Sequence, residues 1–295
     1  MKKIIIALIV IILIGLGIWV ISTKTPEPIG VPDEATTTPT GLPDGVDAGD
    51  ETSIGISEGG LDIPVYNYGS GDKRVLFVGG IHGGYEWNTT LLAYELMDFL
   101  DENPDEIAEG VKVSVIPVLN PDGLNKVVGT TGRFTKDDVP SATSETVPGR
   151  FNANNVDINR NFDCDWQAEG KWQDTTVSGG TKAFSEAESA AMRDYITATN
   201  PDAVVVFYSS AGGVYASNCH DGVLPETTKL TNVYAKASGY PANESFDFYE
   251  ITGDMVNWLA KQNIPAISVL LTDHTNIEWD KNWKGIDAVI ESVAN

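Results

Sequence analysis

The stretch KRVLFVGGIHGGYEWNTTLLAYELMDFL, Lys73–Leu100, indicates the fold class most clearly. Its first part, Lys73–Gly80, is a short and nearly continuous apolar run that ends in glycines, as expected of a buried strand. Its last part, Glu86–Leu100, repeats large apolar residues at helical spacing. A buried strand that leads directly into an amphipathic helix is the repeating unit of an α/β protein.

The same alternation of strand and helix continues to the end of the chain. Further strands are predicted over 111–119, 202–210 and 265–272, and helices over 185–199, 226–238, 252–262 and 282–294. We therefore expect an α/β domain with a mainly parallel sheet and helices on both faces. The long irregular segment 120–181 is expected to carry function, because loops of that length are uncommon in compact domains.

The N-terminal part has a different composition. Eighteen consecutive uncharged residues, Ile4–Ile21, follow two lysines, which is typical of a membrane-spanning helix with a cytoplasmic N-terminus. We expect residues 1–22 to be a membrane anchor, or alternatively a cleaved signal peptide. Residues 23–52 are rich in Pro, Thr and acidic residues and are predicted to be a disordered linker. On either alternative the folded domain, 53–295, lies outside the cytoplasm, membrane-anchored or secreted.

Bulk composition excludes one class of partner. The chain has 295 residues, a formal net charge of −23 and a pI of about 4.3. Such a charge repels nucleic acid, so we expect no nucleic-acid partner. The two cysteines, Cys164 and Cys219, are compatible with one disulfide in an exported domain or with two buried thiols. We expect a monomer, with membrane contact only through the N-terminal helix.

His82 and Glu86 lie where the strand of the opening stretch gives way to its helix, and Gly83 and Gly84 permit a tight turn between them. An imidazole nitrogen and a carboxylate oxygen are common partial ligands of Zn²⁺. The pair alone is also compatible with a plain glycine turn, in which Glu86 stabilises the helix N-terminus. Two further stretches bear on this choice.

These are NPDG, Asn120–Gly123, which follows the second strand, and RFNANNVDINRNF, Arg150–Phe162. The second is compatible with an asparagine-rich loop, since Asn favours turns. It also places Arg150 and Arg160 in a loop of an otherwise acidic protein. Arginine forms bidentate pairs with carboxylates, so the two side chains indicate capture of a substrate carboxylate.

Taken together and in this order, GGIHGGYE, NPDG and RFNANNVDINRNF resemble the motifs of the zinc carboxypeptidases of the carboxypeptidase A type, in a divergent bacterial-type form. The resemblance covers roughly Val75–Trp283. It implies a mixed sheet of about eight strands flanked by helices. It also implies a zinc-dependent hydrolase that cleaves a peptide or amide bond next to a free carboxylate.

The resemblance also implies roles for particular residues. His82 and Glu86 would be zinc ligands, and Arg150, Asn159 and Arg160 would bind the substrate carboxylate. Arg150 would in addition stabilise the developing oxyanion. A glutamate base would take a proton from water and pass it to the leaving amine.

The family's third zinc ligand, a histidine, has no counterpart at its expected place. Tyr208 or Ser209 stands there. The nearest histidine is His220, which is compatible with a third ligand or with a plain loop residue. The chain's remaining histidine is His274.

The family's base also has no direct counterpart, because Leu270 or Leu271 stands at its position. Asp273 and Glu278 are the nearest carboxylates downstream. Glu278 is the candidate base, and a solvated loop acid is the alternative.

Three functions remain open on this basis. The first is an extracytoplasmic metallocarboxypeptidase acting on peptides. The second is a catalytically impaired relative that binds carboxylate-bearing cell-wall peptides. The third is a deacylase of N-acyl amino acids on a related fold.

Overall fold

The computed structural model describes residues 49–295, which belong to one compact unit. The predicted membrane anchor or signal peptide, 1–22, and most of the predicted linker, 23–52, lie outside the described residues. Within residues 49–295, no helix has both the length and the apolar character needed to cross a membrane. The first strand begins at Asp50, so the last three residues assigned to the linker belong to the folded domain.

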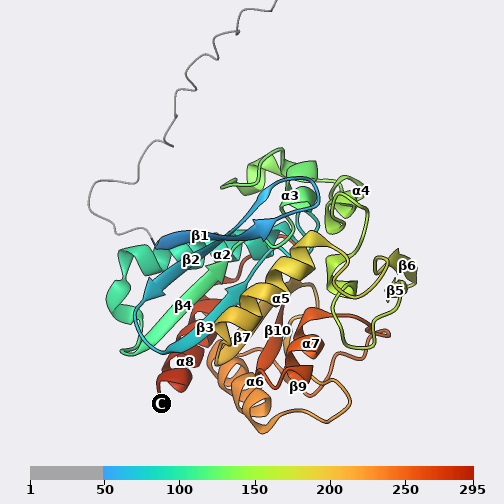
Figure 1. Cartoon of the computed structure of the whole chain (residues 1–295). Coiled ribbons are helices and arrows are strands. Elements are labelled where there is room, and N and C mark those ends of the chain that lie inside the picture. The colour runs from blue at the N-terminus through green and yellow to red at the C-terminus, as the bar shows by residue number, and fades with distance from the viewer. Residues whose placement is uncertain (1–48) are drawn as a thin grey trace, which may run out of the picture. The chain divides into compact units, whose positions relative to one another are not determined.

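An eight-stranded sheet forms the centre of the domain, with strand order β1-β2-β4-β3-β7-β10-β8-β9 (Figure 1). The strands are β1 (Asp50–Ile56), β2 (Asp62–Gly69), β3 (Lys73–Val78), β4 (Val111–Ile116), β7 (Ala203–Ser209), β8 (Gly213–Ala216), β9 (Ala242–Asn243) and β10 (Ala266–Leu271). The four central strands, β4, β3, β7 and β10, run parallel to one another. Strands β1 and β2 pair antiparallel with their neighbours, and β8 pairs antiparallel with β10 but parallel with β9, so the sheet is mixed, as predicted.

Helices cover both faces of the sheet. One face carries α2 (Trp87–Glu102), α6 (Pro225–Ser238) and α8 (Trp279–Ala294), and the other carries α5 (Ala187–Thr199) and α7 (Met255–Lys261). The central strands alternate between the two cores: Val75 and Phe77 of β3 face α2 and α8, whereas Leu76 and Val78 face the opposite side. Burial on both faces explains why these strands read as continuous apolar runs.

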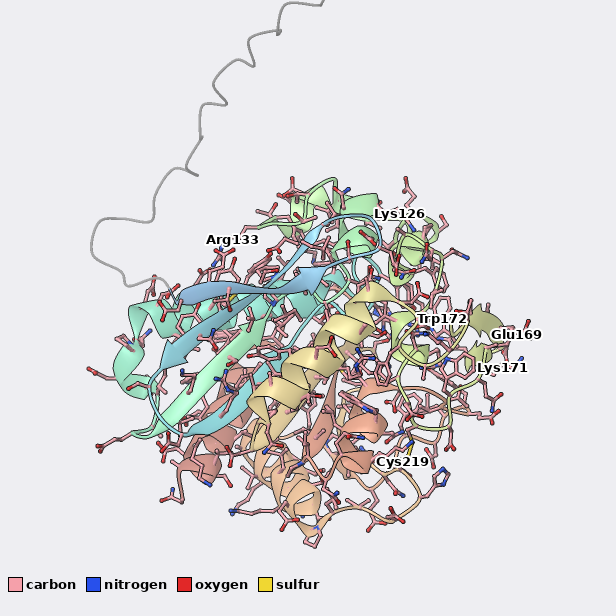
Figure 2. The ribbon with its side chains drawn as sticks, in the orientation of Figure 1. Lys126, Arg133, Glu169, Lys171, Trp172 and Cys219 are labelled. Atoms are coloured by element: carbon pink, nitrogen blue, oxygen red, sulfur yellow. A yellow bond between two sulfur atoms is a disulfide. The ribbon has the colours of Figure 1, made fainter. Side chains whose placement is uncertain are left out.

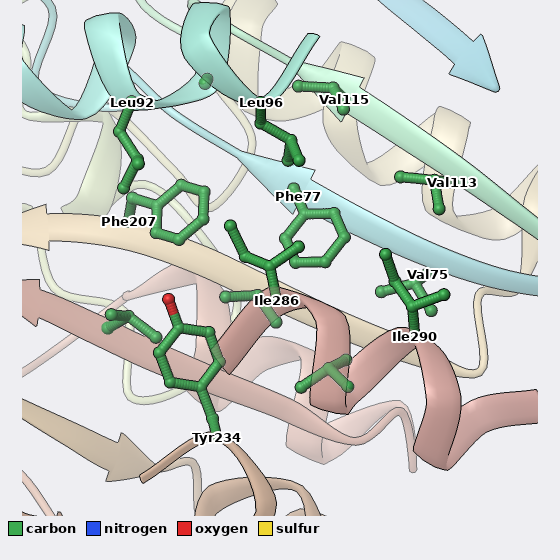
Figure 3. Packing of buried hydrophobic residues seen from close by; sticks show 14 of the residues in the cluster. Val75, Phe77, Leu92, Leu96, Val113, Val115, Phe207, Tyr234, Ile286 and Ile290 are labelled. Atoms are coloured by element: carbon green, nitrogen blue, oxygen red, sulfur yellow. The ribbon is translucent and has the colours of Figure 1, made fainter. Parts of the chain in front are cut away.

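Figure 3 shows the core on the α2 side. Leu92 and Leu96 of α2 and Ile286 of α8 meet Phe77 and Phe207 of the sheet, and all five side chains are fully buried. The rings of Phe77 and Phe207 stack with their centroids 6.1 Å apart. This packing fixes β3 and β7 side by side, and with them the two strand ends that carry polar residues.

The segment predicted to be an irregular loop is partly ordered into short elements. It contains α3 (Pro121–Val128), α4 (Thr143–Thr146) and a hairpin of β5 (Glu169–Trp172) and β6 (Thr175–Ser178), besides the 3₁₀ turns Lys136–Asp138, Val147–Arg150 and Ile158–Arg160. A fourth 3₁₀ turn, Pro104–Glu106, follows α2. Cys164 and Cys219 form a disulfide that joins this segment to the loop after β8, which decides between the two alternatives left open by the sequence.

Candidate active site

A cavity of about 610 Å³ opens at the carboxyl ends of the parallel strands β3, β7 and β10. This is the edge of an α/β sheet at which sites are expected. The residues that line it include five of the predicted site residues: His82, Glu86, Arg150, Asn159 and Arg160. The structure therefore brings together side chains from the end of β3 and from the long connection 117–186, which lies between β4 and α5.

The turn after β3 depends on glycine. Gly83 has φ +42°, and a Cβ atom there would lie 2.7 Å from the carbonyl oxygen of Gly149 and from the amide nitrogen of Leu124. Only glycine accommodates this close approach of two backbone segments. The turn places His82 Nδ1 3.1 Å from Glu86 Oε2, with both residues 3% exposed.

Asp157 organises the centre of this cluster. One carboxylate oxygen lies 3.3 Å from His82 Nε2, and the other accepts hydrogen bonds from Arg150 Nε at 2.9 Å and Nη2 at 2.7 Å. Burial alone raises the pKa of Asp157, but the charges of Arg150 and then His82 outweigh it and hold the pKa well below its usual range. Asp157 stands inside the motif read from the sequence, but no role was predicted for it.

Arg150 is 2% exposed and is held by charge on one side and by aromatic rings on the other. Its Nη1 is 4.0 Å from Glu86 Oε1, and its guanidinium carbon lies 4.6 Å from the ring centroid of Trp172. Trp172 belongs to the β5–β6 hairpin, which carries it to the rim of the domain beside Lys171 and Glu169 (Figure 2). Burial works against the charged guanidinium, but Asp157 and Glu86 raise the pKa of Arg150 overall.

Asn159 and Arg160 lie on the 3₁₀ turn that follows Asp157. Asn159 Oδ1 accepts hydrogen bonds from Tyr208 Oη at 3.2 Å and from the amide of Met255 at 3.1 Å. Arg160 donates to the carbonyl oxygens of Lys171 and Asn159. These bonds fix both side chains. The side-chain NH₂ group of Asn159 and the remaining N–H groups of Arg160 are therefore available to a ligand in the cavity.

Tyr208 and Leu270 occupy the places expected for the third ligand and the base, and both line the cavity. Tyr208 is 6% exposed, its ring centroid is 5.8 Å from that of His82, and burial raises the pKa of its hydroxyl well above the usual value. It is therefore a neutral phenol at physiological pH. Leu270 offers no group that could accept a proton.

The structure corrects the expectation for His220. The disulfide of Cys219 holds this loop against Cys164, and His220 points to solvent, where its Nε2 pairs with Asp165 at 2.7 Å. Its side chain is 69% exposed and does not line the cavity. His220 is not brought together with His82 and Glu86 as a third ligand.

Glu278 is also not placed as expected. Its carboxylate accepts hydrogen bonds from Tyr240 Oη at 2.6 Å and from the amide and hydroxyl of Thr272 at 2.8 and 2.9 Å, and it pairs with Lys281 at 3.0 Å. Burial opposes the charged form, but these bonds lower the pKa of Glu278. The residue ties the start of α8 to the end of β10 and does not line the cavity, so it is not positioned as a base.

The residues present fit two ligand positions of a metal site. Both ring nitrogens of His82 and Oε2 of Glu86 are buried and have no hydrogen-bond partner of good geometry. Such orphaned polar atoms are rare in native interiors, and here they face each other as two ligands of one ion do. Over residues 49–295, no three His, Cys, Asp or Glu side chains converge to hold a metal ion.

Several cavity residues had no predicted role. Among them are Trp172, Ser209, Tyr249, Asp254 and His274. Asp254 caps the N-terminus of α7 by accepting from the amide of Asn257 at 3.2 Å, and burial raises its pKa to about 6 although Arg160 lowers it. As a helix N-cap, Asp254 has a local sequence signal, whereas the places of the other four in the cavity depend on distant segments of the chain.

The fold and the cavity define a class of protein: a mixed α/β domain that holds a buried His–Glu pair and arginine side chains at the carboxyl end of its sheet. The chain belongs to the zinc carboxypeptidase family, whose model matches residues 50–278. This confirms the predicted family and, with it, the carboxypeptidase-like fold.

Comparison with individual proteins agrees with this assignment. The chain is 25% identical over 221 residues to the γ-D-glutamyl-L-diamino acid endopeptidase 1 of Lysinibacillus sphaericus, covering 67% of this chain and 54% of that protein. Its fold is similar to that of a carboxypeptidase A from Helicoverpa armigera, with TM-score 0.64, 18% identity, and coverage of 84% of this chain and 69% of that one.

A third similar fold is that of the murein-tripeptide amidase MpaA from Escherichia coli O157, with TM-score 0.58 and 19% identity. That comparison covers 83% of this chain and 92% of the amidase. Among the first curated relatives, the chain spans between 32% and 54% of their length.

Proposed function

We propose that the protein is a carboxypeptidase-type hydrolase that cleaves a peptide or amide bond next to a free carboxylate. One observation carries the proposal: Arg150, Asn159 and Arg160 line the same cavity as the orphaned pair His82 and Glu86. A carboxylate group and a reacting bond of one small substrate would therefore lie within one site.

The two arginines are suited to different tasks. Arg160 is anchored through its contacts with Lys171 and Asn159, and its free N–H groups would bind the substrate carboxylate beside the Asn159 amide. Arg150 is neutralised by Asp157 and partly by Glu86, so it is suited to stabilise an oxygen that gains charge only in the transition state. Burial of both groups strengthens these interactions relative to water.

His82 and Glu86 would hold the zinc ion implied by the family, which when bound supplies Lewis-acid chemistry to a carbonyl oxygen and to water. Asp157, whose carboxylate lies 3.3 Å from the other ring nitrogen of His82, would hold the ring in place for this purpose. The donor set within residues 49–295 provides two ligands, and the zinc dependence of the reaction is part of the proposal.

For the substrate we propose a short cell-wall peptide. The names of two similar proteins, a γ-D-glutamyl-L-diamino acid endopeptidase and a murein-tripeptide amidase, support this class. A domain held outside the cytoplasm by the N-terminal apolar segment would meet such peptides, and we propose this location for it.

A second candidate function is binding without cleavage. It is favoured by Tyr208 and Leu270, because a neutral phenol and an alkyl side chain stand where a metal ligand and a base are expected. The carboxylate-binding residues would then serve recognition alone. N-acyl amino acids would fit the same arginine side chains and belong in the substrate panel as a third class.

The test is hydrolysis by the full chain of an N-acylated dipeptide and of its C-terminal amide, together with the zinc content of the purified protein. We expect cleavage of the free acid, little cleavage of the amide, and loss of this preference in Arg160→Ala. Arg193→Ala is the matched control, since Arg193 is a half-buried arginine that does not line the cavity. Binding of the free acid without cleavage would establish the second candidate, and equal cleavage of acid and amide would refute carboxylate recognition.

A further inference from the structure

We propose that Nε2 of His274 is the proton-transferring base of this cavity, taking the place of the carboxylate that is absent at Leu270. The inference rests on the proposed hydrolysis and names the residue that performs its proton transfer. It is carried by a hydrogen-bond network that fixes the ring of His274 and selects its tautomer.

His274 follows β10 by three residues, at the same edge of the sheet as the end of β7. Its Nδ1 is 2.7 Å from Oγ of Ser209, the last residue of β7. Its Nε2 is 3.3 Å from Tyr85 Oη and 3.4 Å from Ser210 Oγ. All four side chains line the cavity that also contains His82 and Glu86.

Asn88, the second residue of α2, decides which nitrogen of His274 carries the proton. Its Nδ2 lies 2.8 Å from the carbonyl oxygen of Asp273 and 3.0 Å from that of Asn276, so this end of the amide must be the NH₂ donor. Its Oδ1 therefore faces Ser209 Oγ at 3.2 Å, and this oxygen can only accept. Asn88 is fully buried, so no water competes for these positions.

The hydroxyl of Ser209 has one proton, and it donates this proton in a hydrogen bond to Asn88 Oδ1. Ser209 Oγ must then accept from His274, so Nδ1 of the imidazole carries the hydrogen and Nε2 is the unprotonated nitrogen. The free lone pair of Nε2 is thereby turned toward Tyr85 Oη and Ser210 Oγ in the cavity. Both are hydroxyl groups, which can donate to this lone pair and can turn to a ligand instead.

The surroundings keep this imidazole neutral. Burial is the largest influence and lowers the pKa of His274; among the charges that face it, Glu86 and Asp273 act to raise the pKa, whereas His82 and Arg150 act to lower it. At neutral pH the ring is therefore an unprotonated base. Ser209 acts as a positioning residue, because it touches the imidazole and holds its orientation.

The proton balance of the step is complete without another reactant. Nε2 takes one proton from a water molecule, whose oxygen forms a bond to the scissile carbonyl carbon. The bond between this carbon and the amide nitrogen breaks, and the proton on Nε2 passes to the leaving nitrogen. The products are a carboxylic acid and an amine, and His274 returns to its neutral form.

The test compares the full-length parent with His274→Gln, using His220→Gln as a matched control at an exposed histidine outside the cavity. We expect His274→Gln to lower kcat by about 10²–10⁴-fold, the usual contribution of a general base, and to leave KM and the zinc content unchanged. His220→Gln should match the parent. Nitrogen NMR of the parent at pH 8 should show His274 with its proton on Nδ1, and Ser209→Ala should weaken this tautomer preference.

Undiminished turnover in His274→Gln would overturn the inference while leaving the proposed hydrolysis intact. Loss of zinc in that variant would also overturn it, since His274 would then be a metal ligand. A proton found on Nε2 of the parent would contradict the network that selects the base. A parent that binds peptide but does not cleave it would refute the proposed hydrolysis, and the base role with it.

Discussion

Replacing Asp157 by Asn should destabilise the whole domain, because it leaves the positive charge of a fully buried arginine without its main partner. Asp157 is fully buried and Arg150 is 2% exposed, and they share hydrogen bonds of 2.7 and 2.9 Å. The substitution conserves size and removes the charge, and it also replaces one carboxylate oxygen by an NH₂ group. Packing is therefore largely preserved, and the loss measures the electrostatic and hydrogen-bond contacts of the carboxylate.

The expected loss follows from the burial of the pair. Removing one partner of a buried ion pair costs about 3–5 kcal/mol, since the other charge remains desolvated. Glu86 lies 4.0 Å from the guanidinium and compensates in part, so we expect a loss of about 3 kcal/mol at pH 7. The lowered pKa of Asp157 means that its stabilisation is present above the unfolded-state value of about 4 and is lost as pH falls further.

Denaturant unfolding of both proteins between pH 8 and pH 3 measures this effect. The difference in free energy of unfolding between parent and Asp157→Asn should be constant above about pH 5 and shrink below about pH 4. Asp163→Asn is the control, because Asp163 forms an exposed pair with Lys261 at 2.9 Å that should contribute about 1 kcal/mol or less. A loss at Asp157 no larger than at Asp163 would refute the argument that Arg150 depends on this carboxylate.

Three further predictions concern the same framework. Asp254→Asn should keep the helix cap and stabilise the fold at pH 7.5 by up to about 3 kcal/mol, with no gain at pH 4. The reason is that the raised carboxyl pKa makes the stability of the parent fall as pH rises from about 4 to about 6. Unfolding titrations measure this, and an equal effect at both pH values would show that the carboxyl pKa is not the cause. Gly83→Ala should destabilise the fold by more than the roughly 1 kcal/mol typical of a point mutation, since its Cβ would lie 2.7 Å from backbone atoms, and it should lower ligand affinity. Thermal unfolding and calorimetry measure the two effects, and normal affinity would show that the turn adapts. Cys219→Ser should lower stability by about 4 kcal/mol, as expected for opening a loop of 55 residues, and a change of under about 1 kcal/mol in denaturant unfolding would mean that other contacts hold this loop.

The central strands could be predicted because both of their faces are buried, which leaves uninterrupted apolar runs such as Val75–Val78 in β3. The strands at and near the sheet edges were not predicted. β1, DETSIGI, is mostly exposed and polar, and β8 has only four residues. β1 lacks an apolar run, and β8 is too short for its pattern to distinguish it from a loop.

Some site residues could likewise be predicted from the sequence, whereas the positions of others could not. His82 and Glu86 were predicted because they follow the end of a strand, and strand ends converge at one edge of the sheet. Arg160 was predicted from the motif Arg150–Phe162, in which a loop arginine of an acidic chain suits a carboxylate. His220 and Glu278 were chosen for proximity in sequence to the missing groups. Their actual positions depend on contacts that sequence distance does not reveal: a disulfide beside His220, and the hydroxyl groups around Glu278.

Carboxylate capture by Arg160 is the central claim, and calorimetry of one ligand pair tests it most directly. The pair is an N-acetylated dipeptide with a free C-terminus and the same dipeptide as its amide, each titrated into the parent and into Arg160→Ala. A charge-assisted hydrogen bond contributes about 1.5–3 kcal/mol, so the parent should bind the free acid about 10- to 100-fold more tightly than the amide. Arg160→Ala should bind the two ligands nearly equally. Equal affinities of acid and amide for the parent would contradict the account.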